Sequence, residues 1–143
     1  MKIKQIKLLN FGLLIADEEQ VELKEDSLTG YMLYPTEIQF IKITDRVEGV
    51  VGLRFGIEYY IEGYSNQKYE DVIFYSRIFH PILTNPKTGK SSRLTQERKL
   101  NYLNEINFDY FCFENEWEIQ KGCWTFQIVE NEVIKLEKSF EIL

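Results

Sequence analysis

Residues 53–62, with the sequence LRFGIEYYIE, carry the clearest strand pattern of the chain. Apolar side chains stand at every second position of this stretch, and Tyr60 is the single interruption among the polar residues between them. A period of two is typical of a β-strand with one buried face and one face in water. Gly52 and Gly56 lie on the outer face, where glycine indicates a bulge or the close approach of a neighbouring backbone.

Similar patterns predict strands along the rest of the chain. Their ranges are Lys2–Leu9, Leu13–Ala16, Glu37–Ile43, Val72–Phe79, Phe108–Phe113, Trp124–Val129 and Val133–Ile142. We expect His80-Pro81 to close the fourth of these, and Glu130-Asn131-Glu132 to join the last two as a hairpin. Composition favours strands too, because aromatic residues make up 15% of the chain and Ala16 is its only alanine.

Short strands separated by turns predict an all-β, antiparallel two-sheet sandwich or a barrel. The chain has 143 residues, which is the size of a single domain, 1–143. One segment, Thr95–Glu105, has a helical pattern, with Thr95 as a cap and Leu100 and Leu103 on one face. We expect it to be a short helix in a long loop between the middle strands. The predicted core consists of Phe55, Ile57, Trp124, Phe126 and Phe140.

The charge and hydropathy patterns exclude several classes of protein. The net charge is −6, which argues against a general nucleic-acid binder. No apolar run approaches the roughly 18–20 residues of a membrane span. The first residues lack the apolar region and cleavage site of a signal peptide, so we expect a cytoplasmic protein. The sequence leaves open whether the chain forms a homo-oligomer.

Residues 84–91, with the sequence TNPKTGKS, end like a phosphate-binding P-loop. Thr84 stands where the first glycine of that motif belongs, and Pro86 removes one of the amides that would bind phosphate. P-loops also belong to parallel α/β sheets. A surface turn is therefore the simpler interpretation.

Residues for metal binding or nucleophilic catalysis are scarce. His80 is the only histidine, and its position before Pro81 predicts a turn or rim residue. Cys112 and Cys123 lack the spacing of a zinc site, so we expect them to be reduced and partly buried. No cofactor or metal is predicted, and an enzymatic activity is the less favoured reading.

Two acidic stretches and one basic segment remain. We interpret both acidic stretches as solvated, the first between Asp17 and Asp26 and the second between Asp109 and Glu118. The basic segment, from Lys87 to Lys99, either docks an acidic partner or a phosphate-bearing ligand, or discourages the aggregation of a strand edge with another strand. Together with the preceding histidine, it supplies the candidate binding residues, which are His80, Lys87, Lys90, Arg93, Arg98 and Lys99.

Three parts of the sequence resemble the bacterial family known as domain of unknown function 3859. They are residues 51–59 (VGLRFGIEY), the His80-Pro81 pair with residues 85–90 (NPKTGK), and the C-terminal residues 122–128 (GCWTFQI) and 136–142 (LEKSFEI). The resemblance implies an immunoglobulin-like β-sandwich in a small, cytoplasmic bacterial protein. It implies no activity, substrate or cofactor.

Three functions are compatible with these residues. The first is a non-enzymatic interaction module that presents the basic loop, residues 80–99, or a sheet edge to a protein partner. The second is a small-ligand-binding or hydrolytic domain for an anionic or carbohydrate ligand, using His80, Lys90 and the run from Glu114 to Glu118. The third is an acidic immunity or inhibitor protein.

Overall fold

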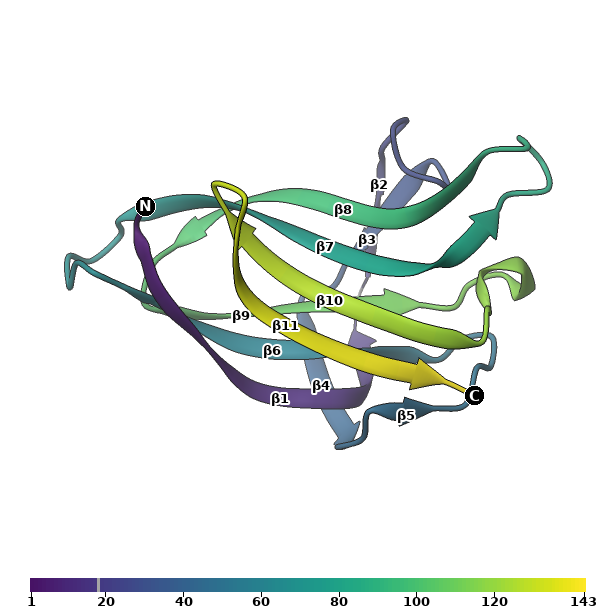
Figure 1. The fold of residues 1–143 in the computed structure, drawn as a ribbon, viewed down its shortest axis with the longest axis horizontal. Coiled ribbons are helices and arrows are strands. Elements are labelled where there is room, and N and C mark those ends of the chain that lie inside the picture. Colours follow the sequence, from purple (N-terminus) through teal and green to yellow (C-terminus); the bar gives the residue numbers. More distant parts are fainter. Residues whose placement is uncertain (18) are drawn as a thin grey trace.

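Two β-sheets face each other in the computed structural model, which describes residues 1–17 and 19–143 (Figure 1). The first sheet has the strand order β4-β1-β6-β9, and the second has the order β5-β11-β10-β7-β8. The strands of the first sheet are β1 (Ile3–Asp17), β4 (Glu37–Lys42), β6 (Arg54–Gly63) and β9 (Glu105–Cys112). Those of the second are β5 (Arg46–Val47), β7 (Asp71–Thr84), β8 (Ser91–Tyr102), β10 (Gly122–Glu130) and β11 (Val133–Ile142). All pairings are antiparallel except that of β5 with β11. The all-β architecture predicted from the sequence is confirmed.

The alternating segment 53–62 forms most of β6, an inner strand of the first sheet. Its alternating residues Phe55, Ile57 and Ile61 are fully buried, as the period of two predicts. A Cβ atom at Gly56 would overlap the backbone of β9, which confirms the predicted close approach. Gly52, by contrast, lies in the turn before β6 with a φ of +92°.

Strand β1 joins two segments that the sequence predicts as separate strands. Its first part pairs with β6 and its last part pairs with β4. Gly12 has a φ of +130°, and the register towards β4 shifts between Leu13 and Leu14. This bulge turns the strand without ending it, because glycine adopts a backbone conformation that other residues avoid.

The predicted helix Thr95–Glu105 is wrong. These residues form most of β8, the turn at Leu103 and Asn104, and the first residue of β9. Leu100 is exposed and Leu103 is buried, so the two do not share a face. Eleven pairs of residues align β8 with β7, and this pairing outweighs the local preference for a helix. The only helical element in residues 1–17 and 19–143 is the single 3₁₀ turn η1 (Glu116–Glu118).

Strand β7 also continues past the point at which the sequence predicts its end. Pro81 lies inside it, and the register towards β8 shifts between Phe79 and Leu83. Proline is accepted at such an irregularity because no ladder hydrogen bond is needed there. The β10–β11 hairpin forms as predicted, and its turn residues Asn131 and Glu132 have φ values of 48° and 64°.

An aromatic cluster fills the space between the two sheets. All five predicted core residues are buried. The ring of Phe55 lies 5.3–5.7 Å from those of Trp124, Phe126 and Phe140, at angles of 72–78°. This edge-to-face arrangement is favoured between aromatic rings and joins the first sheet to the second.

A buried carboxylate fixes the start of β1 to the second sheet. Glu130 of β10 is 3% exposed, and its two oxygens accept hydrogen bonds from the amides of Lys2 and Ile3 at 2.9 and 3.0 Å. The ammonium group of Lys135 donates to the carbonyl of Ile3 at 3.0 Å. Glu130 and Lys135 therefore hold the start of β1 by hydrogen bonds to Lys2 and Ile3, and we call this set of contacts the clamp.

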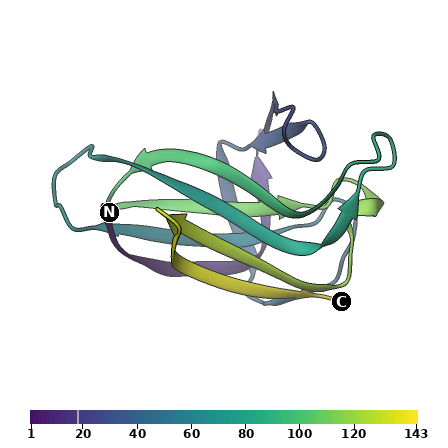
Figure 2. The same cartoon turned by 45° about the horizontal axis from the view of Figure 1, so that its top comes forward.

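A small hairpin stands outside the two sheets. It consists of β2 (Gln20–Leu23) and β3 (Tyr31–Tyr34), and Figure 2 shows it projecting from the end of β1 past β9 towards β8. Strands β8 and β9 are edge strands of different sheets, so the side of the sandwich between them has no strand to close it. No helix in the described ranges is long and apolar enough to cross a membrane.

Candidate binding cavity between the two sheet edges

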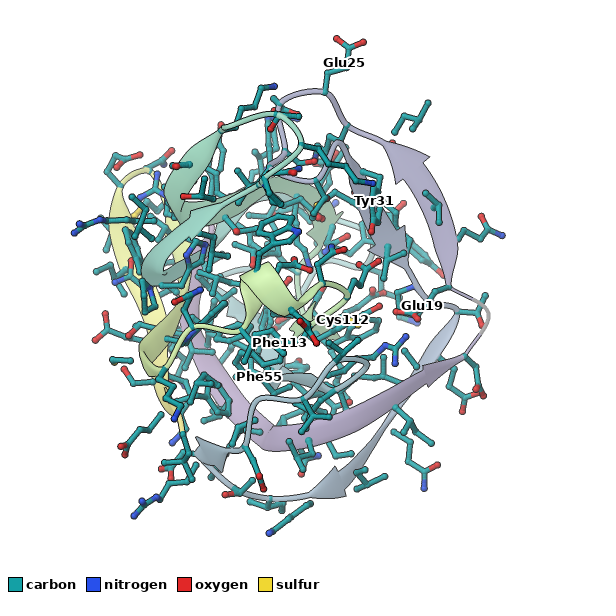
Figure 3. The ribbon with its side chains drawn as sticks, turned by 90° about the vertical axis from the view of Figure 1, so that its right-hand side faces the viewer. Glu19, Glu25, Tyr31, Phe55, Cys112 and Phe113 are labelled. Carbon is teal, nitrogen blue, oxygen red and sulfur yellow. The ribbon has the colours of Figure 1, made fainter. Side chains whose placement is uncertain are left out.

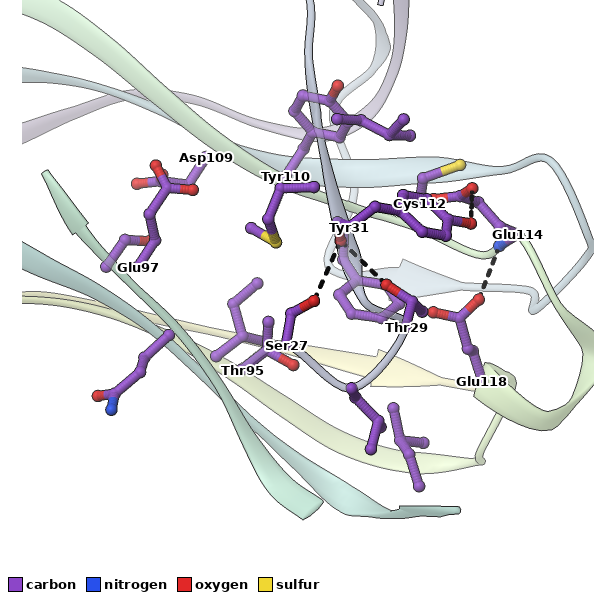
Figure 4. Close-up of a pocket in the computed structure, with 18 residues that line it drawn as sticks. Ser27, Thr29, Tyr31, Thr95, Glu97, Asp109, Tyr110, Cys112, Glu114 and Glu118 are labelled. Carbon is purple, nitrogen blue, oxygen red and sulfur yellow. Dashed lines mark hydrogen bonds between the residues drawn. The ribbon is translucent and has the colours of Figure 1, made fainter. Parts of the chain in front are cut away.

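A cavity of about 120 Å³ lies where the β2–β3 hairpin covers the gap between β8 and β9 (Figure 4). The connection between these strands is only two residues long, which holds the two sheet edges near each other. Figure 3 shows Tyr31 of the hairpin and Cys112 of β9 at the same end of the molecule, with Phe55 and Phe113 in the core. Cavities of this size hold a ring or a short aliphatic chain.

One part of the cavity wall is apolar. The hairpin, strand β7 and strand β9 supply its side chains, which are Leu28, Met32, Leu33, Ile78, Leu83 and Phe111. Ile78 and Leu83 also belong to the central core. A ligand in the cavity would therefore lie against the hydrophobic core of the sandwich.

Polar contacts hold the hairpin in place over the cavity. The Tyr31 hydroxyl donates to a carboxylate oxygen of Glu114 at 2.5 Å, and the amide of Asn85 donates to the carbonyl of Leu28 at 3.2 Å. At the base of the hairpin, Glu19 forms an ion pair with Arg54 and accepts a hydrogen bond of 2.6 Å from the Tyr110 hydroxyl. The hairpin is thus attached to both sheets and to the loop before η1.

The most buried carboxylate of the cavity belongs to Glu118, which is 4% exposed. Its Oε1 atom accepts hydrogen bonds from the backbone amides of Glu114 and Asn115 at 3.1 and 2.9 Å, and from the Asn115 side chain at 3.0 Å. Burial raises the pKa of Glu118, and the nearby charge of Glu114 raises it further, although the Asn115 contacts oppose this. The short turn η1 positions this group, since Glu118 is its last residue.

A second buried carboxylate, Asp109 of β9, lies on the opposite side of the cavity. It accepts a hydrogen bond of 2.7 Å from the Tyr59 hydroxyl and forms an ion pair with Lys99. Burial, together with this carboxylate, raises the pKa of Tyr59 well above its usual value. The ammonium group of Lys99 also donates to the carbonyl of Phe108 at 3.0 Å, so it joins β8 to β9.

Two further lining residues are Glu97 and Cys112. Glu97 belongs to β8, is half-buried and accepts a long hydrogen bond of 3.4 Å from the Tyr34 hydroxyl. Burial raises the pKa of Cys112 to about 11, so the group is a neutral thiol near pH 7 and a poor nucleophile. Both cysteines are free, and Cys123 is exposed.

The structure places His80 inside the sandwich, not at a turn or rim. It is 5% exposed and its ring centroid lies 4.9 Å from that of Trp124. Its Nδ1 atom donates to the carbonyl of Pro81 at 2.8 Å, so Nε2 accepts from the Thr95 hydroxyl at 2.9 Å. Burial lowers the pKa of His80, although the Pro81 contact opposes this. Thr95 lines the cavity, whereas His80 stands behind it.

The five basic candidates divide into two groups. Neighbouring residues Arg98 and Lys99 point to opposite faces of β8, because they pair with Tyr75 and the buried Phe74. Lys99 faces inward to Asp109, and Arg98 is exposed. The other exposed side chains are those of Lys87, Lys90 and Arg93, in the β7–β8 turn and at the start of β8.

The segment that ends like a P-loop forms the tight β7–β8 turn. The amide of Asn85 donates to the carbonyl of Lys90 at 2.8 Å, and the amide of Gly89 donates to the carbonyl of Asn85 at 2.8 Å. These amides are used within the turn, which confirms the simpler interpretation.

The interpretation of the second acidic stretch as solvated is wrong for two of its members. Asp109 and Glu118 are buried, Glu114 is half-buried, and only Glu116 of the four carboxylates is exposed. Sequence reasoning also missed Glu97 and Tyr31. Alternation of residues along β8 places Glu97 on the inner face of the strand. This alternation was not used, because the segment was predicted to be a helix.

Three comparisons place the chain among known proteins. No curated protein matches its sequence. Among solved structures, an immunoglobulin-like protein from Pseudomonas aeruginosa is similar, with a TM-score of 0.66 and 17% sequence identity over 97% of each chain. At this identity the likeness shows the fold, an immunoglobulin-like β-sandwich. The model of the family described as Domain of unknown function (DUF3859) matches residues 2–142, and the chain belongs to this family.

Proposed function

We propose that this protein is a non-enzymatic binding module that holds a small organic ligand in the cavity between β8 and β9. The observation that carries the proposal is the cavity itself, about 120 Å³ in volume and lined by core side chains on one part and carboxylates on another. Pockets that combine an apolar wall with a few convergent polar groups are the usual form of small-molecule sites.

The side chains around the cavity favour binding over catalysis. Both ring nitrogens of His80 are engaged in hydrogen bonds, so the imidazole has no free atom for proton transfer. The Cys112 thiol is neutral near pH 7. Among the described residues, no three His, Cys, Asp or Glu side chains are arranged to hold a metal ion.

A fragment screen with a variant that fills the cavity tests this proposal. Met32 lines the cavity from β3, so Met32→Trp should fill it without altering either sheet. Leu23→Trp is the matched control, because Leu23 lies on the paired strand of the same hairpin and is 84% exposed. A fragment at 100 times its Kd should stabilise the wild type by about 2.7 kcal/mol, seen as a higher Tm.

The proposal predicts that fragments stabilise the wild type and Leu23→Trp but not Met32→Trp. It is wrong if no fragment stabilises the wild type, or if Met32→Trp binds the same fragments equally well. Chemical shifts of backbone amides in β3, β8 and β9 would confirm that the fragments occupy this cavity.

A second candidate function is docking of an acidic protein partner on the basic side chains near β8. Lys87, Lys90, Arg93 and Arg98 are exposed, and none of them forms an ion pair with the residues that the structure describes. Strand β8 is also an edge strand whose outer side pairs with no other strand of the described chain. Exposed basic groups beside a free edge suit an extended acidic segment.

Charge reversal separates this function from the first. The double variant Lys90→Glu, Arg93→Glu should lose a stoichiometric protein partner that the wild type captures from a lysate of the native host. Lys68→Glu, Lys121→Glu is the control, since both lysines are exposed and outside the basic group. Equal capture by all three proteins would contradict docking at this edge.

A further inference from the structure

We infer that the ligand of the cavity is an organic cation, a protonated amine attached to a small apolar group. This inference rests on the proposed function, since it assigns a chemical class to the ligand of the same cavity. It is carried by the orientation of one buried carboxylate and by the charges of the groups that surround it.

The side chain of Glu118 has one oxygen in use and one oxygen free. All three hydrogen bonds from the described residues reach Oε1. The other oxygen points towards Thr29 and the cavity (Figure 4), and it accepts no hydrogen bond from residues 1–17 or 19–143. Glu118 as a whole is 4% exposed, and no buried side-chain oxygen of the described residues lacks a hydrogen-bond partner, so this oxygen is the accessible part of the carboxylate. An ammonium group of a ligand in the cavity would donate a charge-assisted hydrogen bond to this oxygen, and such bonds are strong where little water surrounds them.

The other charged groups lining the cavity are also carboxylates. They belong to Glu97, Asp109 and Glu114. One of these charges is balanced, because Asp109 forms an ion pair with Lys99. No lysine, arginine or histidine is among the residues that line the cavity. The local field therefore favours a cation and opposes an anionic ligand.

The dimensions and the apolar wall limit the rest of the ligand. A ring or a short branched chain fits a volume of about 120 Å³. With its apolar part against Ile78, Leu83 and Phe111, the ligand would direct its ammonium group to the carboxylates. The ammonium carries three N–H donors, enough to reach Glu118 and a second carboxylate or hydroxyl at once.

Three probes of similar shape and different charge test the inference: benzylamine, benzyl alcohol and benzoate. Each is titrated into the full chain near pH 7, and Kd is obtained from backbone amide chemical shifts. We expect benzylamine to bind about tenfold more tightly than benzyl alcohol, the factor that one charge-assisted hydrogen bond provides. Benzoate should not bind measurably.

The variant Glu118→Gln identifies the residue responsible. It should remove the preference for the amine and leave the Kd of benzyl alcohol unchanged. Glu116→Gln is the matched control, because Glu116 lies in the same turn but is exposed, and it should behave as the wild type. Dispersed amide spectra would show that both variants fold.

The outcomes separate the two proposals. If the alcohol binds in the cavity as tightly as the amine, the inferred ligand class is wrong and the binding function stands. If benzoate binds most tightly, the ligand is an anion and not a cation, so the inferred ligand class is wrong and the binding function again stands. If no probe shifts the amides around the cavity and the fragment screen also fails, both proposals are wrong.

Discussion

At the scale of single residues, His80 shows how position in the fold determines chemistry. It is a polar residue before a proline, yet the structure buries it against Trp124 with each ring nitrogen hydrogen-bonded. Its environment favours the neutral ring, because protonation would remove the acceptor that Thr95 needs and place a charge beside the core. The residue thus links the core to a side chain of the cavity wall.

The burial of His80 predicts how stability depends on pH. The pKa of the folded state lies below the ordinary value of 6.5, so the unfolded chain binds more protons between these two values. The free energy of unfolding should therefore fall as the pH drops below about 6.5. The variant His80→Gln should lack the part of this pH dependence that arises from His80. Urea unfolding of both proteins at pH 7.5 and 5.5 measures the difference. Because His80 is the only histidine, its NMR titration can be assigned directly, and a midpoint above 6.5 would contradict the prediction.

Trp124 carries the second prediction at this scale. It is fully buried, its ring packs edge-on against Phe55 and Phe113, and its indole N–H donates to the carbonyl of Gln120 at 2.9 Å. Trp124→Ala should reduce the free energy of unfolding by about 3–5 kcal/mol, since it leaves a large cavity and an unpaired carbonyl. Chemical denaturation measures the change. A loss within error of zero would contradict the packing described here.

At the scale of elements, the decisive contact is that of β6 with β9. Gly56 allows the two backbones to approach, because any side chain there would meet the carbonyl oxygen of Asp109 and the Cα atom of Tyr110. Both of those residues line the cavity. The spacing of two strands in the first sheet therefore helps to determine the shape of the cavity.

We expect Gly56→Ala to displace β9 and lower stability by about 1–3 kcal/mol, the usual cost of overpacking. The displacement should appear as chemical-shift changes in β9 and in the β2–β3 hairpin that rests on it. The substitution should also raise the Kd of any fragment that binds in the cavity. An unchanged spectrum with unchanged stability would show that β9 is not held as closely as described.

The elements also show where sequence reasoning succeeds and where it fails. Strands β6 and β10 are predictable because their buried faces alternate cleanly, whereas Lys138 interrupts the apolar face of β11, and this alternation depends only on neighbouring residues. Strand β8 was missed because its inner face carries Thr95, Glu97 and Lys99, whose side-chain partners lie on β7, β3 and β9. Pairing with distant strands leaves no local signal.

The candidate site was less predictable than the fold for the same reason. Its carboxylates come from β8, β9, the loop after β9 and η1, and the hairpin that covers it belongs to the first quarter of the chain. The acidic stretch from Asp109 to Glu118 was visible in the sequence. Which of its members are buried depends on contacts with Lys99, Tyr59 and Asn115, and none of these contacts can be read from spacing.

At the scale of the whole molecule, one hydrophobic cluster joins both sheets and includes residues from β1 to β11. We expect the chain to unfold in a single cooperative transition, as a single domain of this size does. Fluorescence of Trp117 and Trp124 should report the same urea midpoint as far-UV circular dichroism. Separate midpoints would contradict both the cooperativity and the prediction of one domain.

The clamp between Glu130 and the amides of Lys2 and Ile3 joins residues that are 127 and 128 positions apart. A ribosome makes the first of these residues early and the carboxylate late. The start of β1 therefore lacks its hydrogen-bond acceptor until Glu130 has been made, and the sandwich can be completed only after residue 130 has left the exit tunnel. The β10–β11 hairpin therefore secures a strand that is made well over a hundred residues before it.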